Sequence, residues 1–160
     1  MTGHGVPPRF AYPTKPSGTP TEQRKESFMT FLRRVLKAQA ALWAGFGVVL
    51  ATAPRWLIET LAAQPPVGDD AWLRALGVMA IVLALMMVLV AQRLEDVWWW
   101  AWAFVVLEAG TATVFALNVL LGLPGDAAGW WWWVLAGSNG AVGALELIGL
   151  GLAAQEKPFA

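Results

Sequence analysis

The sequence predicts an all-α integral membrane protein in which four transmembrane helices form an up-down-up-down bundle, with the N-terminus and the C-terminus both cytoplasmic. Of the 160 residues, 58% are hydrophobic and only 14% are charged, whereas soluble domains are about 45–50% apolar and about 25% charged. The apolar residues gather in four segments of about 20–25 residues, the length at which a helix spans a ~30 Å hydrocarbon core. The loops after the second and third segments are short, which favours antiparallel neighbours.

The chain begins with a polar tail that leads into the first span. Residues 1–30 are rich in proline and glycine and predict an extended or disordered cytoplasmic tail. The first span is expected at about 31–53, because Pro54 stops or kinks a helix. A signal peptide cleaved after Ala53 is the alternative, but a proline after the cleavage site disfavours it, so we expect the span to be retained.

The next residues, PRWLIETLAA, predict a short interfacial helix at about 54–63.

The other three apolar segments complete the predicted transmembrane domain, 31–154. Asp69 or Asp70 is placed to cap the start of the second span. None of the segments alternates between apolar and polar residues, so helices are favoured over barrel strands. The remaining spans are predicted at about 72–91, 97–121 and 130–154, followed by a short cytoplasmic tail at 155–160.

Lysine and arginine predict the orientation of the spans. Nine of the 11 basic residues lie in the N-terminal tail, the opening turns of the first span, the middle loop and the C-terminal tail, against two in the other loops. Cytoplasmic loops carry the excess of basic residues, so both termini are predicted to be cytoplasmic. The expected location is the cell (inner or plasma) membrane.

Composition excludes several classes of site. The formal net charge is zero, so binding of nucleic acid through phosphate neutralisation has no support. There is no cysteine, and the only histidine is His4 in the tail, so no histidine- or cysteine-ligated metal or haem is expected. No nucleotide-binding or hydrolase motif occurs. We therefore assign no catalytic residue and no metal ligand, and the cofactor, if any, is left open.

Two acidic residues are predicted to lie inside the bilayer. Glu108 is about 16 Å into the third span and Glu146 about 13 Å from the cytoplasmic end of the fourth, so antiparallel neighbours would bring the two carboxyls together near the midplane. An ionised acid there costs at least ~2.5–3.5 kcal/mol, and no basic residue is available at that depth. We expect the acids either to be protonated and hydrogen-bonded to Thr111, Thr113 or Asn139, or to face a polar cavity, a partner subunit or a cofactor.

Three interpretations of these acids remain open. They could join helices by hydrogen bonds worth about 0.6–2 kcal/mol each, exchange a proton or bind an ion or ligand, or contact a partner protein. Asn139 and Glu146 are seven residues apart and therefore share one helix face. The candidate intramembrane polar site comprises Glu108, Glu146, Asn139, Thr111 and Asn118.

The fourth span also contains small residues at spacings that permit close helix approach. We expect this face to pack inside the bundle, and the alternative is contact with a second copy or another subunit. The candidate helix-packing residues are Gly137, Gly140, Ala141, Gly143 and Ala144.

Most of the tryptophans lie in two blocks, one near each predicted membrane face. Consecutive helical residues point about 100° apart, so each block diverges around its helix and favours an aromatic belt over a pocket. One tryptophan of each block must still face the bundle or a partner. The predicted interface anchors are Trp98, Trp99, Trp100, Trp102, Trp130, Trp131, Trp132 and Trp133.

The short tail, four spans, small loops and third-span acid, together with the string DDAWLRALGV at the start of the second span, resemble small four-helix bacterial membrane proteins of the DoxX-like kind. The resemblance covers about residues 31–154 and implies the same four-helix fold. Some proteins of that kind are described as small subunits of quinone-linked oxidoreductases. The resemblance carries no residue role over to this chain.

The function favoured by the sequence is that of an accessory or structural subunit of a larger membrane complex, of a respiratory or photosynthetic type. Its expected partners are membrane lipids and other membrane subunits or a second copy of itself. One alternative is a stand-alone proton-coupled carrier or channel that uses Glu108 and Glu146. Another is a quinone- or pigment-binding membrane protein. An enzymatic role is not favoured, because the chain lacks a recognisable catalytic set.

Overall fold

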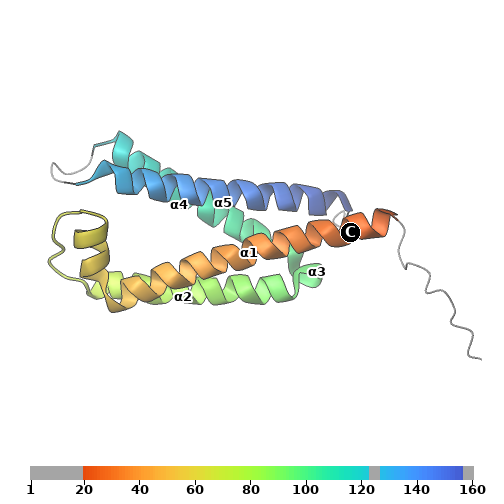
Figure 1. The fold of residues 1–160 in the computed structure, drawn as a ribbon, viewed down its shortest axis with the longest axis horizontal. Helices are drawn as coiled ribbons and strands as arrows, with labels where there is room; N and C mark the ends of the chain where they lie inside the picture. The colour runs from red at the N-terminus through yellow and green to blue at the C-terminus, as the bar shows by residue number, and fades with distance from the viewer. Residues whose placement is uncertain (1–19, 123–126, 157–160) are drawn as a thin grey trace, which may run out of the picture.

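The computed structural model describes residues 20–122 and 127–156, with the side chains of 28–122 and 127–154. Within this part, the regular elements are all helical: α1 (Pro20–Thr52), η1 (Trp56–Leu61), α2 (Ala71–Gln92), α3 (Leu94–Val97), η2 (Trp98–Trp100), α4 (Ala101–Leu120) and α5 (Gly129–Glu156) (Figure 1). Four stretches are long and apolar enough to cross a membrane: Phe28–Thr52, Ala71–Gln92, Leu94–Leu120 and Gly129–Ala154. The four predicted apolar helices are therefore confirmed.

Helix α1 starts earlier than the sequence analysis predicts. It begins at Pro20, so residues 20–30, assigned to the extended tail, are helical. Proline is favoured in the first turn of a helix, and the Glu, Gln, Arg and Lys residues that follow are good helix formers. The predicted tail at 1–19 lies outside the described residues, as does the end of the C-terminal tail at 157–160.

The third span is not one continuous α-helix. Helix α3 gives way at Trp98–Trp100 to a single turn of 3₁₀-helix, η2, before α4 begins at Ala101. The first tryptophan block thus occupies a tightened turn, and Trp98 is buried while Trp99 and Trp100 are exposed. At the other end of α4, Gly122 has a φ of 101°, a left-handed conformation that commonly ends a helix and that glycine adopts without strain.

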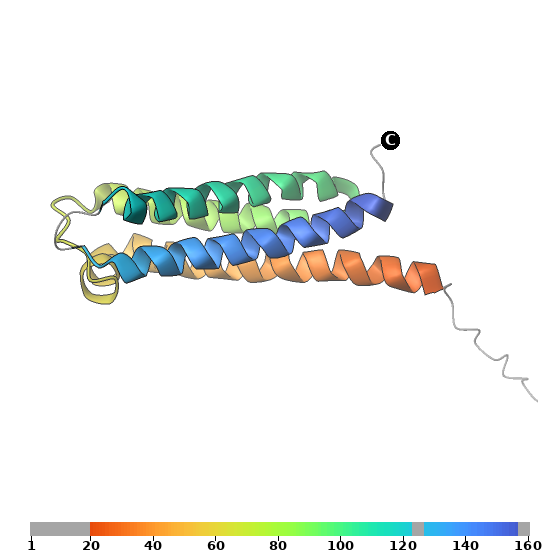
Figure 2. The same cartoon turned by 90° about the horizontal axis from the view of Figure 1, so that it is seen from above.

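The long helices associate as two pairs, α1 with α2 and α4 with α5. They run along the long axis of the molecule, and α1 also packs against α5 (Figures 1 and 2). The start of α1, the end of α5 and α3 lie at one end of the molecule, which we call the α3 end (Figure 1). The opposite end carries η1, and we call it the η1 end.

The α1–α2 pair is held at very short range by two glycines. A Cβ added to Gly77 would lie 2.5 Å from the backbone nitrogen of Ala51 and 2.7 Å from the carbonyl oxygen of Gly47. The helix backbones therefore touch where side chains would ordinarily separate them. Such close approach increases van der Waals contact between helices that gain little from hydrophobicity within lipid.

The segment between α1 and α2 contains η1, a single π-helical turn in which the N–H of Ala62 donates to the carbonyl of Leu57 at 2.9 Å. A short helix is thus present within the predicted 54–63. The wider π-turn buries Leu57 but leaves Trp56 and Leu61 exposed. Asp70 occupies the N-cap position of α2, but its side chain makes no capping hydrogen bond. Asp69 Oδ1 instead accepts from the N–H of Ala71 at 2.9 Å, just before the helix.

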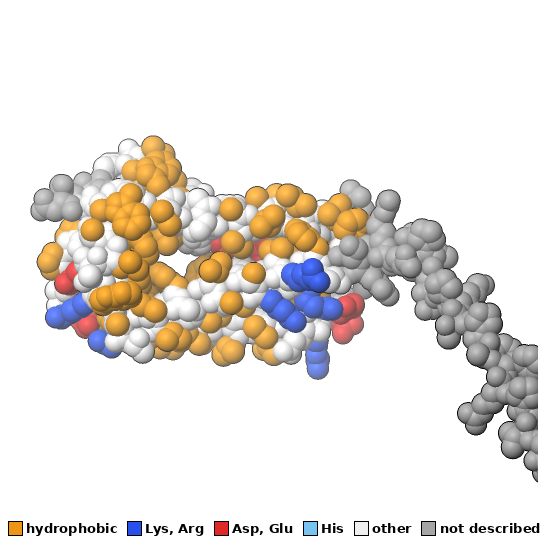
Figure 3. All heavy atoms as spheres, in the orientation of Figure 1, with side chains coloured by type: hydrophobic (Ala, Val, Ile, Leu, Met, Phe, Trp, Pro, Cys, Tyr) orange, Lys and Arg blue, Asp and Glu red, His pale blue; other side chains and the backbone are white. Residues whose placement is uncertain are grey.

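The two pairs are closed against each other at both ends. At the α3 end, Leu32, Leu36, Phe104 and Leu150 belong to the main buried apolar cluster. At the η1 end, Gln64 reaches α5: its Nε2 donates to the carbonyl of Ala128 at 3.0 Å, and its Oε1 accepts from Trp132 Nε1 at 3.2 Å. Between these closures the pairs separate, and a hollow is visible on the flank of the molecule (Figure 3).

Candidate functional site: a buried carboxyl beside a lateral pocket

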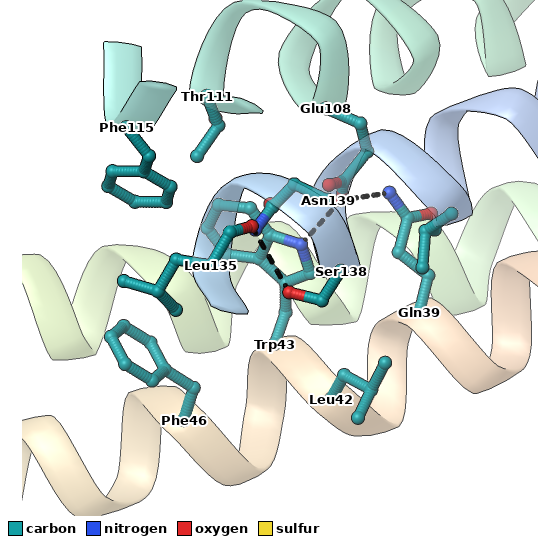
Figure 4. Close-up of a pocket in the computed structure, with 11 residues that line it drawn as sticks. Gln39, Leu42, Trp43, Phe46, Glu108, Thr111, Phe115, Leu135, Ser138 and Asn139 are labelled. Carbon is teal, nitrogen blue, oxygen red and sulfur yellow. Dashed lines mark hydrogen bonds between the residues drawn. The ribbon is translucent and has the colours of Figure 1, made fainter. Parts of the chain in front are cut away.

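The hollow is a pocket of about 220 Å³ between α1, α4 and α5. Its wall is mainly aliphatic and aromatic, and no basic side chain is among the described residues that form it. The lining comprises Gln39, Leu42, Trp43 and Phe46 of α1, Glu108, Thr111 and Phe115 of α4, and Leu135, Ser138, Asn139 and Val142 of α5 (Figure 4).

Glu108 is the polar centre of this site, and α1 supplies its hydrogen-bond donors. Glu108 Oε1 accepts from Gln39 Nε2 at 2.6 Å and from Trp43 Nε1 at 2.7 Å (Figure 4). Gln39 and Trp43 are four residues apart, so both project from one face of α1. These two bonds join the α1–α2 pair to the α4–α5 pair inside the membrane-length part of the fold.

Glu146 lies beside Glu108, also fully buried. Both acids are at most 1% exposed, as is Gln39. A Cβ added to Gly143 would lie 3.1 Å from Glu108 Cβ, so the absence of a side chain at Gly143 lets α4 approach α5 one turn away from Glu146. Both acids therefore lie near the same contact between α4 and α5, where the depth of each along its helix predicts them.

The predicted hydrogen-bond partners of the acids are wrong. Thr111 Oγ1 and Thr113 Oγ1 each donate at 2.7 Å to the carbonyl four residues earlier in α4, and Asn139 Nδ2 donates at 2.7 Å to the carbonyl of Leu135. A hydroxyl or amide on a helix reaches its own preceding turn more easily than a neighbouring helix. Gln39 and Trp43 take the predicted role instead.

The remaining residues of the predicted polar site divide in two. Thr111 and Asn139 line the pocket, although their donors are used within their own helices. Asn118 is exposed near the end of α4 and is not part of the lining. The sequence analysis does not include Gln39 and Trp43 in the polar site. The pattern that indicates them is a glutamine at the start of an apolar run, four residues before a lone tryptophan.

The small residues of α5 do not form one internal packing face. Gly143 is buried against Glu108, as the internal-packing interpretation requires. Gly137 and Gly140 are exposed, and among the described residues nothing approaches a Cβ at Gly137 within 4 Å. Ala141 and Ala144 are exposed too. Internal packing is therefore wrong for Gly137, Ala141 and Ala144, which are exposed. Gly140 faces α4 as Gly143 does, because a Cβ added to it would lie 4.0 Å from Ala112 Cβ.

The tryptophan blocks diverge around their helices. In the first block Trp98 is buried, while Trp99, Trp100 and Trp102 are exposed. In the second, Trp130 and Trp133 are exposed, Trp131 packs on a small cluster with Leu50 and Leu57, and Trp132 bonds to Gln64. Neither block lines the pocket. The tryptophan that does is Trp43, which belongs to no block.

Comparisons with family models, with curated proteins and with solved structures found no match to this chain. The resemblance to DoxX-like proteins stays a prediction.

Proposed function

We propose that this chain is a multi-pass membrane protein that binds a small lipophilic molecule in the lateral pocket. The observation that carries the proposal is the position of Glu108, a buried carboxyl with two donors, at the head of a pocket whose wall is otherwise largely apolar and aromatic. Small-molecule sites combine an apolar wall with a few placed polar groups. An acid within a membrane span is costly enough to make a binding role the first expectation.

The dimensions of the pocket support a ligand of one substituted ring. Its volume of about 220 Å³ exceeds the ~150 Å³ of an engineered apolar cavity that binds benzene. The hollow lies on the flank of the helices (Figure 3), so a ligand dissolved in the bilayer would enter sideways between the helix pairs. In the proposed arrangement, the four helices cross the cell membrane in an up-down-up-down order with both termini cytoplasmic.

Melting of the protein in lipid nanodiscs tests this function with four single-ring probes: ethylbenzene, 2-phenylethanol, 2-phenylethylamine and 1,4-benzoquinone. Leu135→Trp and Ser138→Phe fill the pocket from α5, whereas Leu145→Trp places the same bulk on an exposed part of that helix. We expect at least one probe to raise the melting temperature of the wild type and of Leu145→Trp, but not of the two filled variants, because a ligand stabilises the state that binds it. Equal shifts in all four proteins would reflect partition into lipid and would reject the proposal, as would no shift at all.

A second candidate function, the accessory subunit, is favoured by the exposed small residues of α5. Gly137, Ala141 and Ala144 are exposed along one side of α5, and small residues at such spacing permit close contact with another helix. A second copy or a subunit of a larger membrane complex could cover it.

Purification from native membrane in a mild detergent, followed by mass spectrometry, tests the subunit candidate. We expect an associated protein or a dimer with the wild type and its loss in Ala141→Trp, with Val82→Trp on the exposed face of α2 as the matched control. A monomer alone, from wild-type membranes, would contradict it.

A further inference from the structure

The side chains of the pocket leave several hydrogen-bond acceptors without a donor. Each side-chain donor group makes one hydrogen bond: Gln39 Nε2 and Trp43 Nε1 donate to Glu108, and Thr111, Ser138 and Asn139 donate to carbonyls of their own helices. Only the two amide groups keep a second N–H. Several acceptors are not used. Within the described part of the chain, Gln39 Oε1 is buried without a partner, and Glu108 Oε2 and Asn139 Oδ1 receive no hydrogen bond.

Buried carboxyl oxygens outside the pocket lining also lack hydrogen-bond donors. Both carboxyl oxygens of Glu146 are buried without a partner among the described residues. The groups that meet Glu108 from α1 and α5 are Gln39, Trp43 and Gly143, and the pocket lining contains no Lys, Arg or His. Buried charges in proteins are normally paired, and buried polar groups are normally hydrogen-bonded. A positively charged donor is therefore the group that this site lacks.

The rest of the wall suits an organic cation better than an inorganic one. Three aromatic side chains, Trp43, Phe46 and Phe115, line the pocket, and aromatic faces attract ammonium groups, most strongly where water is excluded. A bare metal ion would contact the carboxyl end and leave the apolar remainder unfilled. The described residues also contain no group of three or more His, Cys, Asp or Glu side chains that could hold a metal.

We propose that the ligand of the lateral pocket is a lipophilic amine in its protonated form, whose ammonium group donates to Glu108 while its hydrocarbon part lies against the aromatic wall. This inference rests on the proposed function and names the ligand class for the same pocket. The free Gln39 Oε1 and Asn139 Oδ1 are further acceptors for ammonium N–H groups. A quinone fits this site less well, because its carbonyl oxygens are acceptors and cannot donate to the unpaired Gln39 Oε1, Glu108 Oε2 and Asn139 Oδ1.

Protons and the ammonium group compete for the same carboxylate. If Glu108 holds a proton, binding of the cation must release it, so affinity for the amine falls as the pH falls. The other titratable group facing Glu108 is Glu146 of α5, whereas α1 contributes only the uncharged Gln39 and Trp43. Exchange of a cation for a proton inside a membrane is the step that a proton-coupled carrier requires.

The same nanodisc assay separates this inference from the function on which it rests. With wild-type protein, we expect 2-phenylethylammonium to bind at least tenfold more tightly than neutral 2-phenylethanol or ethylbenzene. We also expect its affinity to fall as the pH is lowered, because protons compete with the ammonium group for the Glu108 carboxylate while the amine itself stays protonated. Glu108→Gln keeps an oxygen for Gln39 and Trp43 but removes the charge, so it should weaken binding of the cation at least tenfold, and by more than it weakens binding of ethylbenzene, which has no group that donates to Glu108.

The other outcomes contradict either the amine ligand alone or both the amine ligand and the lipophilic pocket. Tighter binding of a neutral probe or of 1,4-benzoquinone to the wild type would overturn the amine and leave the lipophilic pocket standing. Equal affinity of the cation for wild type and a folded Glu108→Gln would also overturn it, whereas sodium chloride displacing the amine at millimolar concentration would point to an inorganic cation instead. Absence of binding by all four probes would overturn the proposed function as well.

Discussion

At the scale of single residues, Glu108 is the one acceptor shared by Gln39 Nε2 and Trp43 Nε1. Glu108→Leu would leave the buried Gln39 Nε2 and the half-buried Trp43 Nε1 without their acceptor, and an unsatisfied buried donor costs about 1–3 kcal/mol. We therefore expect the free energy of unfolding in detergent to fall by about that amount, while Glu108→Gln stays close to the wild type. Reversible unfolding followed by tryptophan fluorescence measures both.

Two controls separate the lost hydrogen bonds from a general effect of substitution on α4. Thr113→Ala removes a hydroxyl that is exposed and bonds only within its own helix, so its effect should be within about 0.5 kcal/mol. The triple variant Gln39→Leu, Trp43→Phe, Glu108→Leu removes donors and acceptor together and should recover most of the loss. If Glu108→Leu alone matched the wild type, Glu108 would not be holding the helix pairs together.

The sequence was sufficient to place the two acids but not their partners. Depth along a helix follows from residue number, so the positions of Glu108 and Glu146 in their spans are enough to set them at one level. Residue number does not show how each helix is rotated about its axis, and therefore which of its side chains face the other helices. Lipid is as apolar as the bundle interior, so the spans are hydrophobic on every side and the pattern does not mark the buried face. For this reason the pattern does not predict the role of Gln39, and the prediction that Gly137, Ala141 and Ala144 pack inside the bundle is wrong.

At the scale of elements, the α1–α2 crossing depends on the missing side chain of Gly77. A Cβ there would meet backbone atoms of Ala51 and Gly47 at 2.5–2.9 Å, and backbone cannot move aside as a side-chain end can. We expect Gly77→Ala to lower the free energy of unfolding by about 1–3 kcal/mol, the usual cost of overpacking. The same denaturation assay measures it.

Gly45→Ala is the matched control for this crossing. Gly45 also belongs to the pair, in α1, but no described atom lies within 4 Å of a Cβ built on it. Alanine is about 0.5–1 kcal/mol better than glycine within a helix, so this variant should be neutral or slightly stabilising. A similar loss in both variants would mean that helix geometry, and not the close crossing, explains the effect.

At the scale of the whole molecule, the chain offers a direct test of its proposed orientation because it contains no cysteine. Single cysteines at Ser17, Gln92 and Gly68 would mark the N-terminal tail, the α3 end and the η1 end; Gln92 and Gly68 are exposed. A maleimide that cannot cross membranes should label only Gly68→Cys in intact cells and all three after lysis. If the maleimide labelled Ser17→Cys in intact cells, the orientation predicted from the basic residues would be wrong.

The division into two helix pairs has a consequence for how the protein is made. Chains are synthesised from the N-terminus at about 5–20 residues per second, so α1 and α2 are available to insert before α4 has left the ribosome. During those seconds Gln39 and Trp43 face lipid without Glu108, an arrangement that is unfavourable but tolerable for two neutral groups. The glycine crossing can form at once, since both of its residues are in the first hairpin. The arrival of Glu108 on α4 then gives Gln39 and Trp43 their acceptor, and α5 follows last.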